Sequence, residues 1–300
     1  MLANFFGKSK PVNFIVLFAL FLSYFSVHVF STNISLKNAE ELLGFLIVFG
    51  IFNFIIAKNN VTFDNSYAFL FFVLLIGFFP DVIKINPLFL ASLSILFFSR
   101  KIYSLQVASN KFYKLFDAGL WLGISFLLAP YTAFFALLLY TAIYVHQQVT
   151  YQTILLPLLG FGAVLFLFFT YCFWVDETFV FLSLFHWNLS YNIDFYQQAT
   201  YLFPLLFIEI VVFYALLLKS PKALSVLNTF KKNWILLFIH LLISSFIIIL
   251  TTPKTGTELL LMFFPVSIIL ANGLELFQKK WISDAVILLF LLGTILMNIL

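Results

Sequence analysis

The sequence has little charge, almost no arginine and one cysteine, and these shortages exclude several classes of protein. Asp, Glu, Lys and Arg make up 9% of its 300 residues, whereas soluble domains carry about 25%. The single cysteine, Cys172, excludes a disulfide framework and a cysteine-rich metal site. Polar segments are also short. The longest, residues 100–116 and 176–200, leave no room for a soluble catalytic or nucleotide-binding domain.

Apolar residues supply what charge does not. They account for 63% of the chain, and the mean hydropathy is +1.10. Apolar runs recur from end to end at about 17 to 25 residues, which is the length needed to cross a hydrocarbon core of about 30 Å. The composition therefore predicts an all-α, polytopic bundle of transmembrane helices, with residues 1–300 forming one integral membrane domain and no soluble domain.

Hydropathy predicts about eleven spans. They are 12–30, 41–57, 67–82, 87–99, 117–129, 131–146, 153–175, 201–218, 234–251, 257–274 and 284–300. The first run extends to Phe30 without a small-residue cleavage site, so we expect it to remain attached as a helix. The two spans that flank Ala129–Pro130 could instead form one kinked helix.

Basic residues separate into two sets when the amino terminus is placed inside and the carboxyl terminus outside. The inner loops then collect thirteen basic residues, and the outer loops keep Lys37, Lys84 and Lys254. This division follows the positive-inside rule, and merging the pair at Pro130 would contradict it. We therefore predict a multi-pass protein of a bacterial inner membrane. The inner positive charge suits anionic lipid headgroups and implies no nucleic-acid partner.

Acidic residues gather on the opposite, predicted outer face. Seven of the twelve lie there: Glu40, Glu41, Asp81, Asp176, Glu177, Asp194 and Glu258. Carboxylates contribute little to topology, so membrane insertion does not explain this distribution. They either form a solvated surface or build a site in which a carboxylate acts as a base or binds a divalent cation through oxygen ligands.

One carboxylate lies inside an apolar span, YLFPLLFIEIVVFYALLLK, with Glu209 at its centre. Charged groups at this depth are costly and usually face the bundle interior with a partner. At 1.5 Å per residue, Glu209 lies about 13 Å and His240 about 9 Å from the predicted inner boundary. The sequence thus predicts a Glu209–His240 pair, which could be structural or could couple protons. A water-filled cavity around Glu209 is the alternative.

The long outer segment DETFVFLSLFHWNLSYNIDFYQQ alternates aromatic and polar residues. Trp and Tyr are typical of the headgroup region, so we expect this segment to lie along the interface, with a short amphipathic helix. Asp176, Glu177 and His186 are further site candidates in it. His186 could be a base or ligand, or only an interfacial residue.

The sequence resembles two families. NPLFLASLSILFFSRKIYSL, KLFDAGLWLGISFLLAPYTAFFALLLYTAIY and TTPKTGTELLLMFFPVSIILANGLE are similar to segments of GT-C type lipid-linked glycosyltransferases. The resemblance implies sugar transfer from a polyprenyl-phosphate donor, with Glu40 or Glu41 at the catalytic position and Lys84 or Lys254 near the phosphate. The whole chain, beginning with MLANFFGKSKPVNFIV, also resembles an uncharacterised family of multi-spanning Bacteroidota proteins.

Three functions follow from these features. The first is a GT-C-like glycosyltransferase at the outer face that uses Glu40, Glu41 or Asp81 as its base. The second is a non-catalytic subunit or assembly factor of an envelope complex, which the short loops favour. The third is a proton-coupled secondary transporter that uses Glu209 and His240. The Gly119–Gly123 pair is expected to let helices approach closely rather than to carry chemistry.

Overall fold

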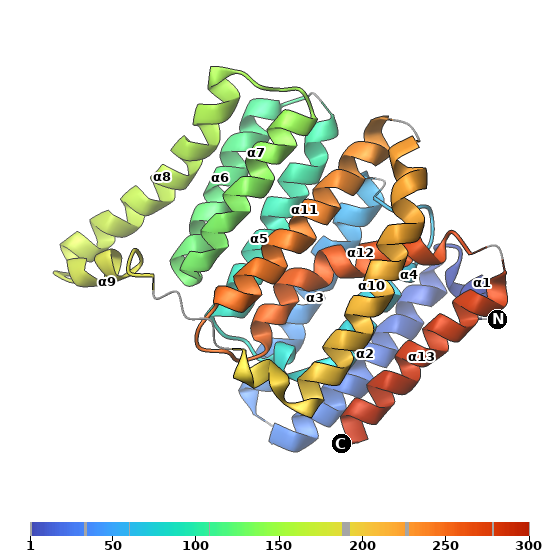
Figure 1. The fold of residues 1–300 in the computed structure, drawn as a ribbon. Helices are drawn as coiled ribbons and strands as arrows, with labels where there is room; N and C mark the ends of the chain where they lie inside the picture. The colour runs from blue at the N-terminus through green and yellow to red at the C-terminus, as the bar shows by residue number, and fades with distance from the viewer. Residues whose placement is uncertain are drawn as a thin grey trace.

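A computed structural model of the protein describes residues 2–32, 35–59, 61–107, 109–187, 193–225, 228–277 and 279–299, and within these ranges every regular element is a helix (Figure 1). The α-helices are α1 Leu2–Phe6, α2 Pro11–Thr32, α3 Leu36–Asn59, α4 Tyr67–Phe78, α5 Pro87–Tyr103, α6 Lys111–Leu128, α7 Ala136–Val145, α8 Tyr151–Trp174, α9 Thr178–Ser183, α10 Ala199–Ser225, α11 Asn228–Leu250, α12 Leu260–Leu274 and α13 Lys280–Ile299. Short 3-10 helices are η1 Pro80–Ile83, η2 Ser104–Gln106, η3 Pro130–Phe135, η4 Asp194–Gln197 and η5 Thr257–Leu259.

A helix lies at each of the eleven predicted ranges. In the described part of the chain, eight helices are long and apolar enough to cross a membrane: α2, α3, α5, α8, α10, α11, η5 with α12, and α13. Helix α4 and the segment η3–α7 are apolar but shorter. The fold is therefore that of a helical, multi-pass membrane protein whose surface fits a lipid bilayer. The count of eleven crossings and the sidedness of the termini stay predictions.

Helices α4 and α12 form the centre of the bundle. Every residue of α4 is buried, and so is every residue of α12 except the half-buried Met262, and α2, α10, α11 and α13 pack around them. An apolar surface on all sides of α4 fits this enclosed position. Aromatic rings link the layers: Phe52 of α3 lies 4.3 Å from Phe72 of α4 and 5.8 Å from Phe264 of α12, between ring centroids.

Helix α4 is too short to cross the hydrocarbon core alone. Its 12 residues span about 18 Å at 1.5 Å per residue, against about 30 Å of hydrocarbon. The chain then turns at Phe79 and continues as η1, where Val82 and Ile83 are buried. Irregular backbone is tolerated at membrane depth only where protein or water surrounds it, and here the protein does so.

The chain reverses direction at Ala129–Pro130. Ala129 is extended between α6 and η3, and η3 packs back against α6. The two open ends of this hairpin both lie at η2. Lys114 Nζ donates to Ser104 O at 2.8 Å, and Gln148 Nε2 donates to Leu105 O at 3.2 Å. The segments are an antiparallel hairpin, as predicted, and the single kinked helix is wrong.

Helix α8 packs on α6 through glycines on both helices. A Cβ on Gly119 would lie 2.1 Å from Pro157 O, and one on Gly160 would lie 2.2 Å from Phe116 O. Backbone approaches backbone at both positions, so any side chain would force the helices apart. The predicted packing role of the Gly119–Gly123 segment is confirmed.

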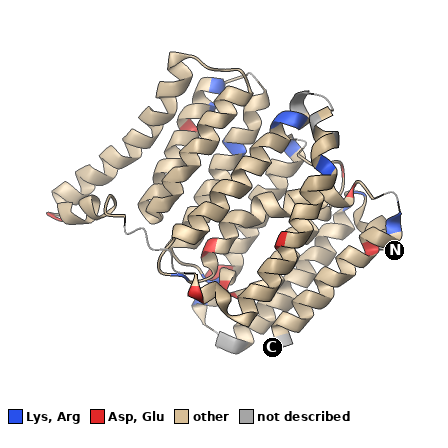
Figure 2. Cartoon of the chain, viewed as in Figure 1, with Lys and Arg blue, Asp and Glu red and all other residues tan. Residues whose placement is uncertain are grey.

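Charged residues collect at opposite ends of the bundle (Figure 2). Most lysines, with Arg100, lie toward the end drawn uppermost, where Lys101 pairs with Asp117 at 2.5 Å and Lys219 with Glu275 at 3.2 Å. The other end, here called the acidic end, carries η1, η4, the start of α10 and the loop 251–256, and acidic side chains gather there.

Substituting valine at Gly160 tests the α6–α8 contact. We expect Gly160→Val to lower the thermal unfolding temperature of the detergent-purified protein, because its Cβ meets the Phe116 carbonyl. Overpacking of this kind costs about 1–3 kcal/mol. Gly162→Val is the matched control on the same helix, since nothing lies within 4 Å of its Cβ position. Equal unfolding temperatures for the two variants would contradict the packing.

His146, which follows α7, should make stability depend on pH. It is 8% exposed, and burial, helped by the Lys232 charge, lowers its pKa to about 4, against about 6.5 in an unfolded chain. Protonation therefore favours unfolding, so its contribution is complete above pH 6.5 and is lost as the pH falls toward 4.

We expect His146→Gln to remove this dependence. Relative to the variant, the wild type should lose about 1–2 kcal/mol of unfolding free energy between pH 7.5 and pH 5. Denaturation of both proteins at the two pH values measures the difference, and parallel losses in both proteins would rule out this role for His146.

Candidate functional site at the acidic end

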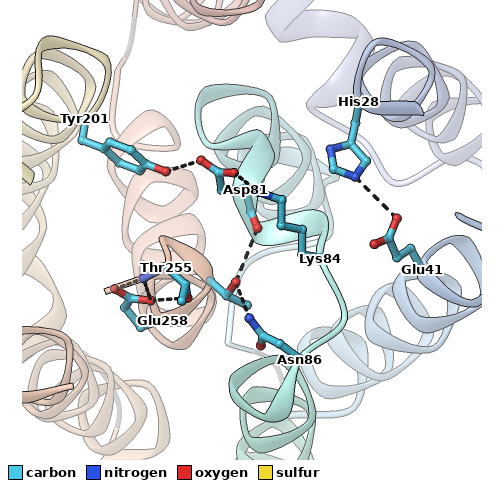
Figure 3. Close-up of polar contacts among 9 residues, drawn as sticks. His28, Glu41, Asp81, Lys84, Asn86, Tyr201, Thr255 and Glu258 are labelled. Carbon is cyan, nitrogen blue, oxygen red and sulfur yellow. Dashed lines mark hydrogen bonds and ion pairs between the residues drawn. The ribbon is translucent and has the colours of Figure 1, made fainter. Parts of the chain in front are cut away.

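Five side chains from three regions converge at the acidic end, and we call them the acidic-end site: Asp81, Lys84, Tyr196, Tyr201 and Glu258. Figure 3 shows Asp81 between Lys84 of the segment after η1 and Tyr201 at the start of α10, with Glu258 of η5 nearby. The sequence prediction had named Asp81, Lys84 and Glu258 on the outer face. It had not named the tyrosines.

Asp81 takes its position from the point where α4 ends, at Phe78. Pro80 begins η1 and places Asp81 in its first turn. One carboxylate oxygen, Oδ1, accepts from Lys84 Nζ at 2.6 Å, and Oδ2 accepts from the Tyr201 hydroxyl. The side chains of Asp81 and Lys84 are 37% and 51% exposed. The carboxylate is thus oriented by two donors while remaining reachable from outside.

Glu258 is the opposite case, because it is fully buried at 0% exposure. A buried carboxylate must be compensated by hydrogen-bond donors. Tyr196 OH donates to Oε1 at 2.5 Å, and Thr255 donates its backbone N–H at 3.2 Å and its hydroxyl at 3.0 Å. Burial, followed by the Glu258 charge, raises the pKa of Tyr196. Tyr196 therefore stays protonated and keeps donating.

Gly256 brings the Glu258 loop against Asp81. Its φ is +84°, and a Cβ there would lie 2.7 Å from the Tyr201 hydroxyl and 3.2 Å from Asp81 Cβ. Only glycine satisfies both the left-handed backbone and this close approach. The rings of Tyr196 and Tyr201 lie 5.7 Å apart between centroids. The two carboxylates are therefore connected through neighbouring tyrosines.

Thr257 and Asn86 fix the same loop from the other side. Thr257 donates its hydroxyl to the backbone oxygen of Asp81 at 3.4 Å and accepts from Asn86 Nδ2 at 2.9 Å. Asn86 also caps α5 by accepting from Phe89 N at 2.9 Å. The ends of α4, α5 and α12 are in this way held together beneath Asp81.

Lys254, a predicted phosphate ligand, has a different position. Its Nζ donates to the backbone oxygens of Ile248 and Ile249, the latter at 2.8 Å, and lies 5.7 Å from the Tyr196 ring centroid. Burial lowers its pKa. In this arrangement Lys254 caps the carboxyl end of α11, and no ion pair joins it to Asp81 in the described structure.

Glu40 and Glu41 lie inside a helix, which corrects the predicted start of the second span at residue 41. Helix α3 begins at Leu36, so both residues lie in its second turn. The predicted boundary was late because Lys37, Glu40 and Glu41 make this turn polar. Glu40 is exposed, while Glu41 Oε2 lies 3.4 Å from His28 Nε2 (Figure 3).

The first two outer segments nevertheless adjoin. A Cβ on Gly44, one turn after Glu41, would lie 3.2 Å from Ile85 of the segment that follows η1. The His28–Glu41 pair therefore lies beside the acidic-end site without a hydrogen bond to it among the described residues.

Asp176, Glu177 and His186 lie elsewhere. All three are exposed, and they flank α9, the short helix at the end of α8 on the far side of the bundle from η4 and α10 (Figure 1). The predicted interfacial segment does contain a short helix. Residues 188–192 of that segment lie outside the described ranges.

The predicted Glu209–His240 pair is not formed. His240 is fully buried among Tyr103, Phe135 and Phe264, with Tyr103 OH 3.5 Å from Nδ1. Glu209 instead lines an apolar groove of about 600 Å³ between α10 and α11. His240 faces the bundle interior as expected, but Glu209 faces the groove, so similar depths along the two helices do not bring the side chains together.

The site holds two kinds of reactive group and offers limited support for a metal. Asp81 can accept a proton or a hydrogen bond, and Lys84 can bind an anion. Within the described ranges, no group of three or more His, Cys, Asp or Glu side chains is placed to hold a metal ion.

Comparison with known proteins gives a family without an activity. The model of a family of unknown function (DUF6427) matches residues 1–299. No curated protein and no solved structure matches the chain. These comparisons do not support the predicted resemblance to glycosyltransferases.

Removing the Tyr196 hydroxyl tests whether Glu258 depends on it. We expect Tyr196→Phe to reduce stability by about 1.5–3 kcal/mol, the usual range for a hydrogen bond to a charged group. Thermal unfolding in detergent measures the effect. Tyr171→Phe on the exposed face of α8 is the control, because Tyr171 is 63% exposed. If both substitutions were equally mild, Glu258 would be compensated by other donors.

Proposed function

The chain belongs to the family of unknown function DUF6427, and we propose its function from the acidic-end site because no curated protein matches it. In this proposal the protein acts on a lipid-linked polar group at the outer boundary of a bacterial inner membrane. The most specific form of this proposal is a GT-C-like glycosyltransferase that uses a sugar carried on polyprenyl phosphate.

The ion pair of Asp81 and Lys84 carries the proposal. These two residues are the most exposed members of the site, since Tyr196 is half-buried and Tyr201 and Glu258 are buried, and they lie where several membrane-spanning helices end. Lysine is a compact charge that binds phosphate well. Lys84 would bind the donor phosphate, and its departure from Asp81 would free one carboxylate oxygen to accept the proton of an acceptor hydroxyl.

The remaining residues of the site position Asp81. Tyr201 donates to the second oxygen of Asp81, and Gly256 seats the Glu258 loop against both residues. These contacts hold the Asp81 carboxylate of η1 against the start of α10. Preorganised groups of this kind lower the cost of orienting a base during reaction.

Other predicted residues take smaller parts in this proposal. Glu41 pairs with His28 and Glu40 points to the surface, so Asp81 is the preferred base. Lys254 caps α11 and is not the preferred phosphate ligand. A divalent cation could bind between Asp81 and the substrate phosphate, since Mg²⁺ sites commonly use one or two carboxylates plus phosphate oxygens.

A second candidate function is a subunit of an envelope complex. Glu209 favours it, because an intramembrane carboxylate that faces outward on a groove needs a partner from outside the chain. The transporter has no comparable support, since the Glu209–His240 pair that would couple protons is not formed.

The glycosyltransferase proposal is tested by replacing Asp81. Purified protein in proteoliposomes would be given radiolabelled undecaprenyl-phosphate glucose and a lipid extract as acceptor, and labelled product would be measured. Asp81→Asn should lower transfer by at least about 100-fold, because a general base contributes 10²–10⁴-fold. Glu177→Gln, an exposed carboxylate on the α9 side, should leave transfer unchanged.

Two results would contradict this role. Full transfer by Asp81→Asn would exclude Asp81 as the base. A wild-type protein that neither transfers the sugar nor retains undecaprenyl phosphate in native mass spectrometry would remove the enzyme proposal altogether.

A further inference from the structure

The groove between α10 and α11 contains an unexplained carboxylate. Its walls are α10 from Leu202 to Leu216 and α11 from Phe238 to Ile249, and its floor is α12. It runs about 21 Å along α10 at 1.5 Å per residue, which is most of the hydrocarbon thickness. Tyr196 and Gln197 are the polar residues at the mouth of the groove. Further in, the lining is apolar apart from Glu209 and Ser245.

Glu209 has no partner of its own in the part of the chain that the structure describes. No hydrogen bond or ion pair reaches its side chain, which is exposed on the groove wall. It is ten residues from the start of α10, about 15 Å along the helix. A carboxylate at this depth is unfavourable unless a cation or hydrogen-bond donor meets it.

We propose that the groove is the docking site for a transmembrane helix of a different protein, which places a Lys, Arg or His side chain against Glu209. This inference deepens the second candidate function, a subunit of an envelope complex. It does not rest on glycosyl transfer.

Charge complementarity selects this occupant over a lipid. A hydrocarbon chain fills an apolar groove but offers no donor to Glu209. Lipid headgroups stay at the boundary and do not reach about 15 Å into the bilayer. A helix with apolar side chains and one basic residue satisfies both the walls and the carboxylate.

A second copy of this chain cannot supply the basic residue. In the described helices every lysine and the arginine lie near a helix end. Of the histidines closest to mid-depth, His240 is sealed inside the bundle, and His28 is buried near the end of α2 beside Glu41. The cation therefore comes from a chain of different sequence.

The groove also touches the acidic-end site. Tyr196 lines the mouth of the groove and donates to Glu258. A docked helix would therefore contact the residue that holds the Glu258 loop, so the partner would cover one side of the site while leaving the exposed faces of Asp81 and Lys84 open.

Photo-crosslinking in native membranes tests the proposal. Benzoylphenylalanine would be placed at Leu206 and Leu242 on the groove walls, and at Leu167 on α8 as a lipid-facing control; these positions are 46%, 53% and 69% exposed. We expect crosslinks from the two groove positions to one protein. The crosslinked peptide should come from an apolar segment of at least about 18 residues with a basic residue near its centre.

The role of charge is tested in the same assay. Glu209→Leu and Glu209→Gln should each lower the crosslink yield by about tenfold, as expected for loss of an intramembrane polar pair. Glu209→Lys should abolish it, and exchanging the partner's basic residue for Glu should restore it. Asp81→Asn should crosslink like the wild type, which separates docking from catalysis.

Several outcomes would overturn the proposal. These are crosslinks to lipid only, crosslinks to a second copy of this chain, or a partner segment without a central basic residue. Crosslink yields that Glu209→Leu and Glu209→Gln leave unchanged would also overturn it. The Gln variant nearly matches the size of Glu and keeps the test valid if the Leu variant misfolds.

Discussion

The hydrocarbon layer offers no water to polar groups, and this constraint shapes the whole molecule. Backbone groups must be satisfied internally, so every described regular element is a helix. Irregular backbone occurs at η1 and η3, and both pack against neighbouring helices. Charged side chains follow the same rule. Most gather at the two ends of the bundle, where Lys219 and Glu275 form a buried pair, and Glu209 on the groove wall is an exception.

This constraint also builds the acidic-end site. Helix α4 is enclosed on all sides and stops after 12 residues, and its continuation through η1 packs against α2 and η5, with Tyr201 of α10 hydrogen-bonded to Asp81. Asp81 is therefore delivered to a place where Tyr201 and the Gly256 turn can bind it. Glu258 is tolerated at full burial because Tyr196 and Thr255 donate to it. The exposed ion pair of Asp81 and Lys84 is therefore supported by the hydrogen-bonded side chains beside it.

Sequence reasoning predicted what depends on local properties. Apolar run length placed a helix at all eleven ranges, Pro130 marked a reversal, and Gly119 marked a close helix contact. It was wrong where the answer depends on rotation or on tertiary contact. The depths of Glu209 and His240 were compatible with pairing, but their helices turn them to different faces. Tyr196 and Tyr201 looked like ordinary interfacial aromatics, because only folding brings them to Glu258 and Asp81. The Thr255-x-x-Glu258 spacing was a local signal that could have been read.

The central claim is that the open pair of Asp81 and Lys84 receives the phosphate of a lipid. A cryo-electron microscopy map of the protein in nanodiscs with undecaprenyl phosphate tests it most directly. The claim predicts phosphate density about 3 Å from Lys84 Nζ, with Asp81 still bonded to Tyr201. Phosphate density only beside the lysines at the opposite end of the bundle, with the ion pair between Asp81 and Lys84 still formed, would contradict it.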